Sequence, residues 1–276
     1  GLPGAVVVEP TAHDAVWAHR RPTGEDAGLG VTLAMGLANS ETGVIAQLPE
    51  KDGDVWVTVQ GRADRLLLDI TQAVGRIPFS FAWSGADFAI LSAHKLGGPK
   101  GVCALILRDS VDIEPVLPGG GQEMGRRSGT ENVIGIAGFG AAAEAAQHDL
   151  DTGQWDTVEK LRNILETTLA SAANDTIFVG QKLKRLPNTA CFATPGWKGE
   201  TQVMQMDLAG FAVSSGSACS SGKVKSSRVL QAMGLADAEA QVALRVSRGP
   251  TTTEDEIMRF AEVWQQHHEK FRRRAA

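Results

Sequence analysis

The sequence predicts an α/β protein that has a large domain with a mostly parallel sheet, followed by a smaller α+β domain. Short, nearly continuous apolar runs alternate with helical patterns in the first half of the chain, which is typical of strands buried on both faces of a parallel sheet. The pattern changes at the turn-like sequence Asp151-Thr152-Gly153, after which helical stretches alternate with short strands. We therefore expect a large domain over residues 1–150 and a small domain over residues 151–276.

The expected elements of the large domain follow from these runs in order. The predicted strands are Ala5–Val8, Val31–Met35, Leu66–Asp69, Phe88–Leu91 and Cys103–Leu107. The alanine-rich stretch Glu131–Asp149 keeps apolar residues at helical spacing, so we expect a packed helix there.

The small domain is expected to mix helices with short strands. Helices are predicted over 155–172 and 226–233, and strands over 189–193, 211–214 and 242–247. The last helix begins near Thr253, because Thr253 and Glu256 have the spacing of a capping box. One apolar stripe should bury that helix, through Ile257, Phe260, Trp264 and Phe271.

Composition excludes several classes of function. The formal net charge is −5 over 276 residues, whereas proteins that bind nucleic acid usually present a basic face. No apolar run approaches the roughly 18–20 residues that a membrane-spanning helix needs, and the first residues do not resemble a signal peptide. We expect neither a nucleic-acid partner nor a membrane span.

The chain has three cysteines, Cys103, Cys191 and Cys219. A small odd number argues against a disulfide framework and favours a reducing compartment, so we expect a cytoplasmic protein. No CxxC or HExxH spacing is present, so no metal site is expected. Cys103 and Cys191 lie inside strand patterns and are interpreted as structural.

A candidate ligand site follows the run Phe88–Leu91. The sequence Ser92-Ala93-His94-Lys95 ends this strand and leads into a glycine-rich turn, and ligands of open α/β sheets bind at the carboxyl ends of strands. A lysine there can form a Schiff base when its neighbours lower its pKa. Taken alone, Lys95 is more simply a solvated loop lysine.

Asp69 ends another apolar run, where a carboxylate is a poor packing choice without a partner. A pyridinium nitrogen would be such a partner, because the carboxylate would keep the ring protonated. Gln72 lies one turn further and can donate to a cofactor oxygen. The alternative for Asp69 is a helix cap.

Two further segments carry polar chemistry. Residues 119–130 combine five glycines, two arginines and Thr130 before a helix, which is typical of an anion site or of an ordinary loop. Cys219 lies among small polar residues near Lys223, in a setting that suits a reactive thiolate better than a core cysteine.

Together these segments resemble the cysteine desulfurases of the class V aminotransferase family, within fold type I of the pyridoxal-phosphate enzymes. The motifs are SAHKLGGPKG, DITQAVG, GGGQEMGRRSGTEN and SSGSACSSGK, and the last two resemble the NifS-like subgroup with its long sulfur-carrying loop. The resemblance runs from about Ala5 to the last helix. It implies a homodimer that converts L-cysteine to L-alanine and supplies sulfur to an acceptor protein, for iron–sulfur clusters or other sulfur-containing products.

The resemblance also assigns roles in the cofactor site. Lys95 would hold pyridoxal 5′-phosphate as a Schiff base and shuttle protons. Asp69 would pair with the pyridinium nitrogen, and Gln72 would bond the phenolic oxygen. Ser92 and His94 would help to bind the phosphate or transfer protons.

Other roles are implied outside these motifs or across subunits. His13 matches the histidine that stacks on the cofactor ring, and Arg245 matches the arginine that clamps the substrate carboxylate through its planar fork. Thr130 would reach the phosphate in the partner subunit. Cys219 would attack the substrate sulfur and retain it as a persulfide.

The chain departs from the family pattern in two places. The family usually has Asn-Asn-Glu-Thr-Gly, whereas this chain has Ser40 after Asn39. We assign Asn39 to substrate binding and Ser40 to the cofactor site. The family also has a substantial segment before the position of Gly1, so we expect that the N-terminal part of the large domain is missing from the sequence.

Three alternatives remain open. A selenocysteine lyase or an aminotransferase of the same fold would share the cofactor site, and release of alanine and sulfide from cysteine would distinguish them from a desulfurase. A truncated, non-catalytic homologue would lack a cofactor that borohydride can reduce.

Overall fold

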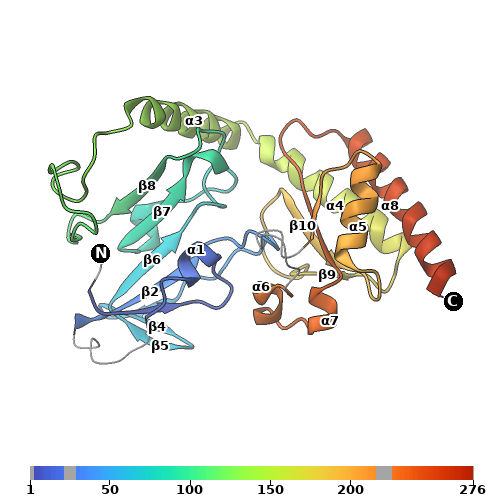
Figure 1. Cartoon of the computed structure of the whole chain (residues 1–276), viewed down its shortest axis with the longest axis horizontal. Coiled ribbons are helices and arrows are strands. Elements are labelled where there is room, and N and C mark those ends of the chain that lie inside the picture. The colour runs from blue at the N-terminus through green and yellow to red at the C-terminus, as the bar shows by residue number, and fades with distance from the viewer. Residues whose placement is uncertain (1–2, 22–28, 216–225, 276) are drawn as a thin grey trace. The chain divides into compact units, whose positions relative to one another are not determined.

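The structure is a computed structural model that describes residues 3–21, 29–215 and 226–275 (Figure 1). The chain divides into two compact units. The first comprises Gly1–Ala38 and Ala46–Leu150, and the second comprises Asn39–Ile45 and Asp151–Ala276. Cys219, the predicted nucleophile, lies outside the described residues.

The first unit is built on a five-stranded sheet with the order β1-β2-β6-β7-β8. Its strands are β1 (Ala5–Val8), β2 (Val31–Gly36), β6 (Arg65–Asp69), β7 (Phe88–Ser92) and β8 (Cys103–Leu107). The first four strands run parallel, and β8 pairs antiparallel with β7. The predicted mostly parallel sheet is therefore confirmed, and each predicted strand lies within one residue of the observed one.

The outermost strand differs from the expectation of burial on both faces. Among the described strands β8 pairs only with β7, so it forms an edge of the sheet, and both Cys103 and Leu105 are exposed. Cys103, which the strand pattern led us to interpret as structural, is therefore not a buried core residue. Cys191, in contrast, is completely buried.

The sequence patterns also missed a small antiparallel sheet of β3 (Glu50–Asp52), β4 (Val55–Thr58) and β5 (Gly61–Ala63). Charged residues fill β3, which hides it from hydropathy patterns. Trp56 of β4 is buried, and the ammonium of Lys51 lies 4.7 Å from the centre of its ring. Among the described residues, the loops of this unit contain the short helices α1 (Asp14–Trp17) and α2 (Phe81–Ser84) and the 3₁₀ helix η2 (Ala93–Lys95).

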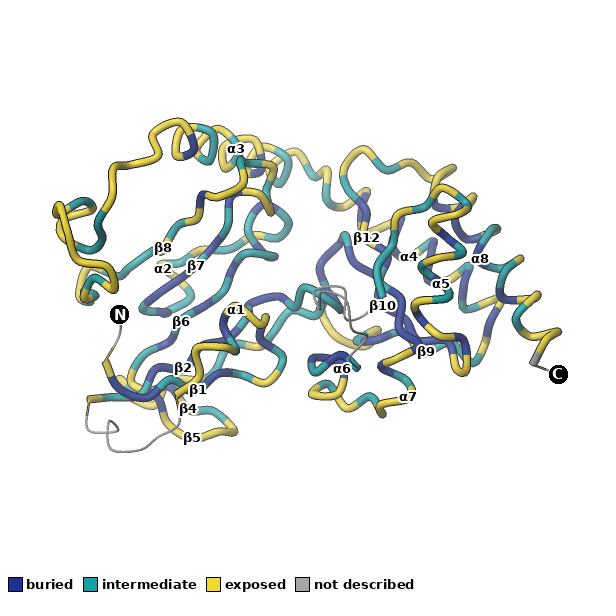
Figure 2. The backbone as a smooth tube through the Cα atoms, in the orientation of Figure 1, coloured by how far each residue is buried: buried dark blue, intermediate teal, exposed yellow. Residues whose placement is uncertain are grey.

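The long helix α3 (Val133–Asp151) was expected to be packed, and that expectation is wrong for most of its surface. Only Gly135 and Ala146 are buried, while Val133 and Ile134 are 69% and 89% exposed. Figure 2 shows that most of α3 is exposed. Small residues let one side of the helix approach the loops after β6 and β7. The remaining apolar surface has no partner among the described residues.

The second unit has a sheet with the order β11-β12-β10-β9 and antiparallel pairing throughout. Its elements are α4 (Gln154–Ala172), β9 (Ile177–Phe178), β10 (Thr189–Ala193), α5 (Gly199–Leu208), β11 (Ser214–Ser215), α6 (Arg228–Ala232), α7 (Asp237–Ala240), β12 (Ala243–Ser247) and α8 (Glu254–Ala275). In place of the strand predicted at 211–214, the structure has the shorter strand β11, which begins at Ser214. The sequence patterns did not predict α5.

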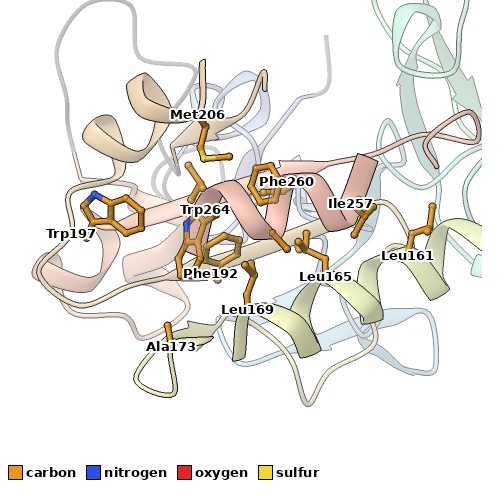
Figure 3. Close-up of a cluster of buried hydrophobic side chains, with 14 residues drawn as sticks. Leu161, Leu165, Leu169, Ala173, Phe192, Trp197, Met206, Ile257, Phe260 and Trp264 are labelled. Atoms are coloured by element: carbon orange, nitrogen blue, oxygen red, sulfur yellow. The ribbon is translucent and has the colours of Figure 1, made fainter. Parts of the chain in front are cut away.

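The core of the second unit lies among α4, α8 and β10 (Figure 3). Phe192 meets Trp264 edge to face, with ring centres 5.7 Å apart. The predicted stripe of α8 is confirmed, since Phe260 and Trp264 are buried in this cluster. The capping box is also present: Thr253 donates its N–H to Glu256, and Glu256 donates its N–H to the Thr253 hydroxyl.

The segment 39–45 joins the second unit through backbone hydrogen bonds. The Ile45 N–H donates to the Lys184 carbonyl over 2.9 Å, and the Leu186 N–H donates to the Gly43 carbonyl over 2.7 Å. Gly43 has a φ of +74°, and a Cβ there would lie 2.9 Å from the Cβ of Thr189. A larger residue at position 43 would therefore disturb this contact.

Across the described ranges, no helix is both long enough and apolar enough to cross a membrane. The same residues contain no group of three or more His, Cys, Asp or Glu side chains arranged to hold a metal ion.

Candidate active site

Most of the predicted cofactor residues follow the parallel strands of the first unit. Asp69 is the last residue of β6 and Ser92 is the last residue of β7, and these strands are neighbours in the sheet. The carboxyl ends of parallel strands lie at one edge, which is where open α/β sheets bind ligands. The sequence-predicted residues Asp69, Gln72, Ser92, His94 and Lys95 therefore share one edge of the first unit.

The carboxylate of Asp69 is half-buried and held in one orientation. Its Oδ1 accepts a hydrogen bond of 3.0 Å from the Thr71 N–H, and the Asp69 carbonyl accepts one of 2.9 Å from the Leu37 N–H. Among the described residues, Oδ2 of Asp69 has no hydrogen-bond partner. One carboxylate oxygen thus fixes the group, and the other is available to a ligand.

Lys95 and His94 lie on the 3₁₀ helix η2, directly after β7. Ala93 is buried and anchors this turn, whereas the side chains of His94 and Lys95 are exposed. Within the described part of the chain, the Lys95 ammonium forms no hydrogen bond or ion pair. A free, accessible amine at a strand end is what covalent attachment of an aldehyde requires.

Arg76 joins the two turns that carry these residues, and the sequence patterns gave no indication of this role. Its Nη1 donates to the Gln72 carbonyl over 2.8 Å, and its Nη2 donates to the Lys95 carbonyl over 2.5 Å. Partial burial lowers the pKa of the Arg76 guanidinium below its ordinary value. From the sequence alone, an arginine in a turn-like segment is expected to be a charged surface residue. Only the fold places the carbonyls of Gln72 and Lys95 close enough to accept its hydrogen bonds.

The same two turns pack closely against α3. Gly75 has a φ of +75°, and a Cβ built on it would lie 2.7 Å from the Cβ of Ala146 and 3.8 Å from the Cβ of Leu96. A Cβ on Gly98 would lie 3.3 Å from the Cβ of Ala142. Gly75 and Gly98 therefore allow the two turns to pack closely against α3.

His13 caps the short helix α1. Its Nδ1 accepts a hydrogen bond of 3.2 Å from the Ala15 N–H, and the side chain is exposed. The capping bond leaves its other ring nitrogen free to interact elsewhere.

Thr130 is exposed in the loop before α3. The two cations of that loop are already paired with acids: Arg126 lies 2.7 Å from Asp112, and Arg127 lies 3.1 Å from Glu123. These pairs reduce the positive charge that the sequence pattern led us to expect at an anion site.

In the second unit, the structure brings Arg245 and Ser40 together. Arg245 Nη1 donates to the Ser40 carbonyl over 2.8 Å, and Nη2 donates to the Ser214 hydroxyl over 3.1 Å. Its buried Nε has no hydrogen-bond partner among the described atoms. Asn39 shapes the turn, because its side-chain oxygen accepts from the N–H groups of Glu41 and Thr42.

A hydrogen bond that was not predicted ties this turn to α6. The Ser227 hydroxyl donates to Glu41 Oε2 over 2.6 Å, and it also accepts from the Leu230 N–H as the helix cap. Nearby, burial raises the pKa of the Cys191 thiol to about 12, with the charge of Glu41 acting in the same direction. Cys191 is therefore a thiol at neutral pH and a poor nucleophile.

Comparisons with known proteins identify the relatives of this chain. The cysteine desulfurase of Cereibacter sphaeroides is 37% identical over 268 residues, which are 91% of this chain and 66% of the relative. The cysteine desulfurase of Gluconacetobacter diazotrophicus is 41% identical over 227 residues, or 82% of this chain and 55% of the relative. This chain thus spans between about half and two thirds of the length of these curated relatives.

Solved structures show the same fold. A NifS-like protein from Rickettsia africae superposes with a TM-score of 0.81 at 26% identity, covering 96% of this chain and 76% of that protein. A second NifS-like protein gives a TM-score of 0.78 at 27% identity, covering 97% of this chain and 75% of that one. The family described as aminotransferase class-V matches residues 31–260, so the chain belongs to the class V aminotransferases, with the fold type I architecture of its NifS-like neighbours.

Proposed function

We propose that this chain provides the active site of a pyridoxal-phosphate-dependent cysteine desulfurase, which converts L-cysteine to L-alanine and leaves the sulfur as a persulfide on Cys219. The observation that carries the proposal is the free amine of Lys95 on the turn next to the anchored carboxylate of Asp69. The names of the relatives, which are cysteine desulfurases, support the same reading.

The donor set fits the cofactor. Pyridoxal 5′-phosphate offers an aldehyde, a pyridine nitrogen, a phenolic oxygen and a phosphate. Lys95 provides the amine for the aldehyde, Asp69 the carboxylate for a protonated ring nitrogen, and Gln72 an amide donor for the phenolic oxygen. Ser92 and His94 provide polar groups for the phosphate.

The bound cofactor would supply an electron sink for carbanions of the amino acid. The role of Asp69 is to keep the ring nitrogen protonated, because a carboxylate close to a cation favours its charged form. Lys95 would hold the cofactor through its amine, and the same amine would accept or donate a proton during the reaction. His13 is proposed to stack on the ring and Ser40 to bond a cofactor oxygen.

Substrate recognition is assigned to Arg245 and Asn39 in the second unit. A guanidinium binds a carboxylate bidentately, and the Nε donor of Arg245 still lacks an acceptor among the described residues. Arg245 would therefore hold the α-carboxylate of cysteine.

The sulfur step balances without another reactant. The thiolate of Cys219 attacks the sulfur of the substrate, the sulfur–carbon bond breaks, and a sulfur–sulfur bond forms. The substrate carbon is reduced and takes a proton to give alanine, while the enzyme sulfur is oxidised to the persulfide. The buried Cys191 cannot substitute, because its thiol does not ionise near neutral pH.

We propose a homodimer that passes its sulfur to an acceptor protein, for iron–sulfur clusters or other sulfur-containing products. The exposed apolar residues Val133, Ile134 and Ile136 of α3, just after Thr130, support a subunit contact in this region. Thr130 would then reach the cofactor phosphate of the partner subunit. A reducing compartment such as the cytoplasm suits an enzyme that needs a free Cys219 thiolate.

The test is to incubate the purified protein with pyridoxal phosphate, reduce it with borohydride and locate the modified peptide by mass spectrometry. We expect the adduct on Lys95, its loss in Lys95→Ala, and its retention in Lys100→Ala, a matched control because Lys100 is exposed in the same loop. Release of alanine from cysteine should depend on Lys95 and Cys219. An adduct on Lys100, or alanine formation without Lys95, would refute the assignment.

A further inference from the structure

We propose that Arg76 is a positioning residue that fixes Lys95 relative to the turn carrying Asp69 and Gln72. The proposal rests on the proposed function, since it assumes that Lys95 attaches the cofactor. It adds a residue that touches neither cofactor nor substrate.

The geometry favours this role because one guanidinium spans two turns. The carbonyls of Gln72 and Lys95 are 23 positions apart in the sequence and belong to loops after neighbouring strands. The planar fork of Arg76 donates one N–H to each of them, at 2.8 and 2.5 Å. A guanidinium is suited to such a bridge because its donors are held in a rigid plane.

Among the described residues, the Arg76 guanidinium interacts with no acidic side chain. Arg185, a buried arginine of the second unit, is paired with Glu166, whereas Arg76 forms no ion pair among the described residues. Partial burial already disfavours its charge, as its lowered pKa reflects. The two carbonyls stabilise the half-buried charge of Arg76. Both hydrogen bonds are strong because a charged donor forms stronger hydrogen bonds than a neutral donor does.

The turn at Lys95 needs such an anchor. Two residues after Lys95, Gly97 has a φ of +96° and no atom near the position of a Cβ, so the backbone there has few steric restrictions. On its other side, Ala93 holds the turn by accepting from the N–H groups of Leu96 and Gly98. The hydrogen bond from Arg76 fixes the backbone carbonyl of Lys95 itself. It thereby fixes the position from which the reactive side chain extends.

Arg76→Met tests the proposal, because methionine keeps an unbranched apolar stem and removes both donors. Arg76→Lys is the second variant, since a single ammonium keeps the charge but lacks the fork that spans two carbonyls. Arg108→Met is the matched control. Arg108 is also half-buried in the first unit, and its Nε donates to the Ala86 carbonyl over 3.0 Å, at the amino end of β7 rather than near Lys95.

The parent protein and each variant, freed of cofactor, are mixed with pyridoxal phosphate. The rate at which the cofactor attaches covalently to Lys95 is measured, together with the pH midpoint of the visible absorbance of the attached cofactor and the thermal unfolding curve. We expect Arg76→Met to slow attachment about tenfold or more and to shift the midpoint, because a displaced amine loses its preset orientation. Arg76→Lys should lie between Arg76→Met and the parent, and Arg108→Met should match the parent in rate and midpoint.

The outcomes separate this proposal from the proposed function. If the parent protein carries no adduct on Lys95, the proposed function fails. If the parent carries the adduct while Arg76→Lys attaches cofactor at the parental rate with the parental midpoint, the positioning role is wrong and the proposed function stands. An equal slowing in Arg108→Met would also overturn the proposal, since the effect would then be general loosening of the first unit.

Discussion

Removing the charge of Glu166 should destabilise the second unit strongly. Glu166 and Arg185 form a bidentate pair with N–O distances of 2.6 and 2.8 Å, and their side chains are only 6% and 5% exposed. Glu166→Leu leaves the Arg185 guanidinium buried without its acceptor. Such an uncompensated buried charge costs about 3–5 kcal/mol.

The surroundings of Glu166 place the expected cost in the upper part of that range. Burial lowers the pKa of Arg248 to about 10, and Glu166 is the neighbour that opposes this shift, while Arg162 and Arg185 reinforce it. Two donor atoms of Arg248, Nε and Nη1, are buried without partners among the described residues. Removing Glu166 therefore takes away the carboxylate that offsets the charges of Arg185 and Arg248.

The assay is urea unfolding followed by a signal of the second unit, such as the fluorescence of its buried tryptophans. Two further variants define the comparison. The double change Glu166→Leu with Arg185→Met should cost less than half of the single change, because no charge is left unpaired. Glu269→Leu, in an exposed pair with Arg273, should cost no more than about 0.5 kcal/mol. A single Glu166 variant as stable as the Glu269 variant would refute the reasoning.

Four other outcomes are expected. Gly75→Ala should lower unfolding free energy in urea by more than about 2 kcal/mol, because it combines a positive φ with a Cβ 2.7 Å from that of Ala146. Burial lowers the pKa of His268 from 6.5, so its neutral form is favoured in the fold; stability should fall as the pH drops below 6.5, and His268→Phe should reduce this loss in urea titrations at several pH values. Cys219→Ala should retain cofactor colour but release little alanine, and undiminished turnover would contradict the sulfur step. Arg245→Lys should raise the KM for cysteine while cofactor binding stays intact, and an unchanged KM would place the carboxylate elsewhere.

Elements with a strong local signal were predicted well from the sequence. The strands around Leu68 and Ala89 are apolar runs that end at polar residues. The bounds of these strands and the polar residues at their ends could therefore be predicted from neighbouring residues alone. The capping box of Thr253 and Glu256 likewise depends on residues three positions apart. In these cases the residues that form the structure are neighbours in the sequence.

Features that depend on distant partners could not be predicted in this way. The segment 39–45 belongs to the second unit because Gly43 and Ile45 pair with residues 184–186, more than a hundred positions away. For α3, composition correctly indicates a helix, but whether Ile134 is covered depends on what lies against it in space. Arg76 illustrates the same limit for a site residue, since nothing near it in the sequence identifies the Lys95 carbonyl as its acceptor.

The division of the chain gives the proposed chemistry a consequence that can be measured. Lys95 and Asp69, which would attach and polarise the cofactor, belong to the first unit, whereas Asn39 and Arg245, which would recognise the substrate, belong to the second. Changes in the first pair should therefore alter cofactor attachment and its spectrum, and changes in the second pair should alter the KM for cysteine. Ser40 is the informative exception, because it belongs to the second unit but is assigned to the cofactor. If Ser40→Ala shifts the cofactor spectrum as well as the KM, the second unit contributes to both functions through the turn that Arg245 holds.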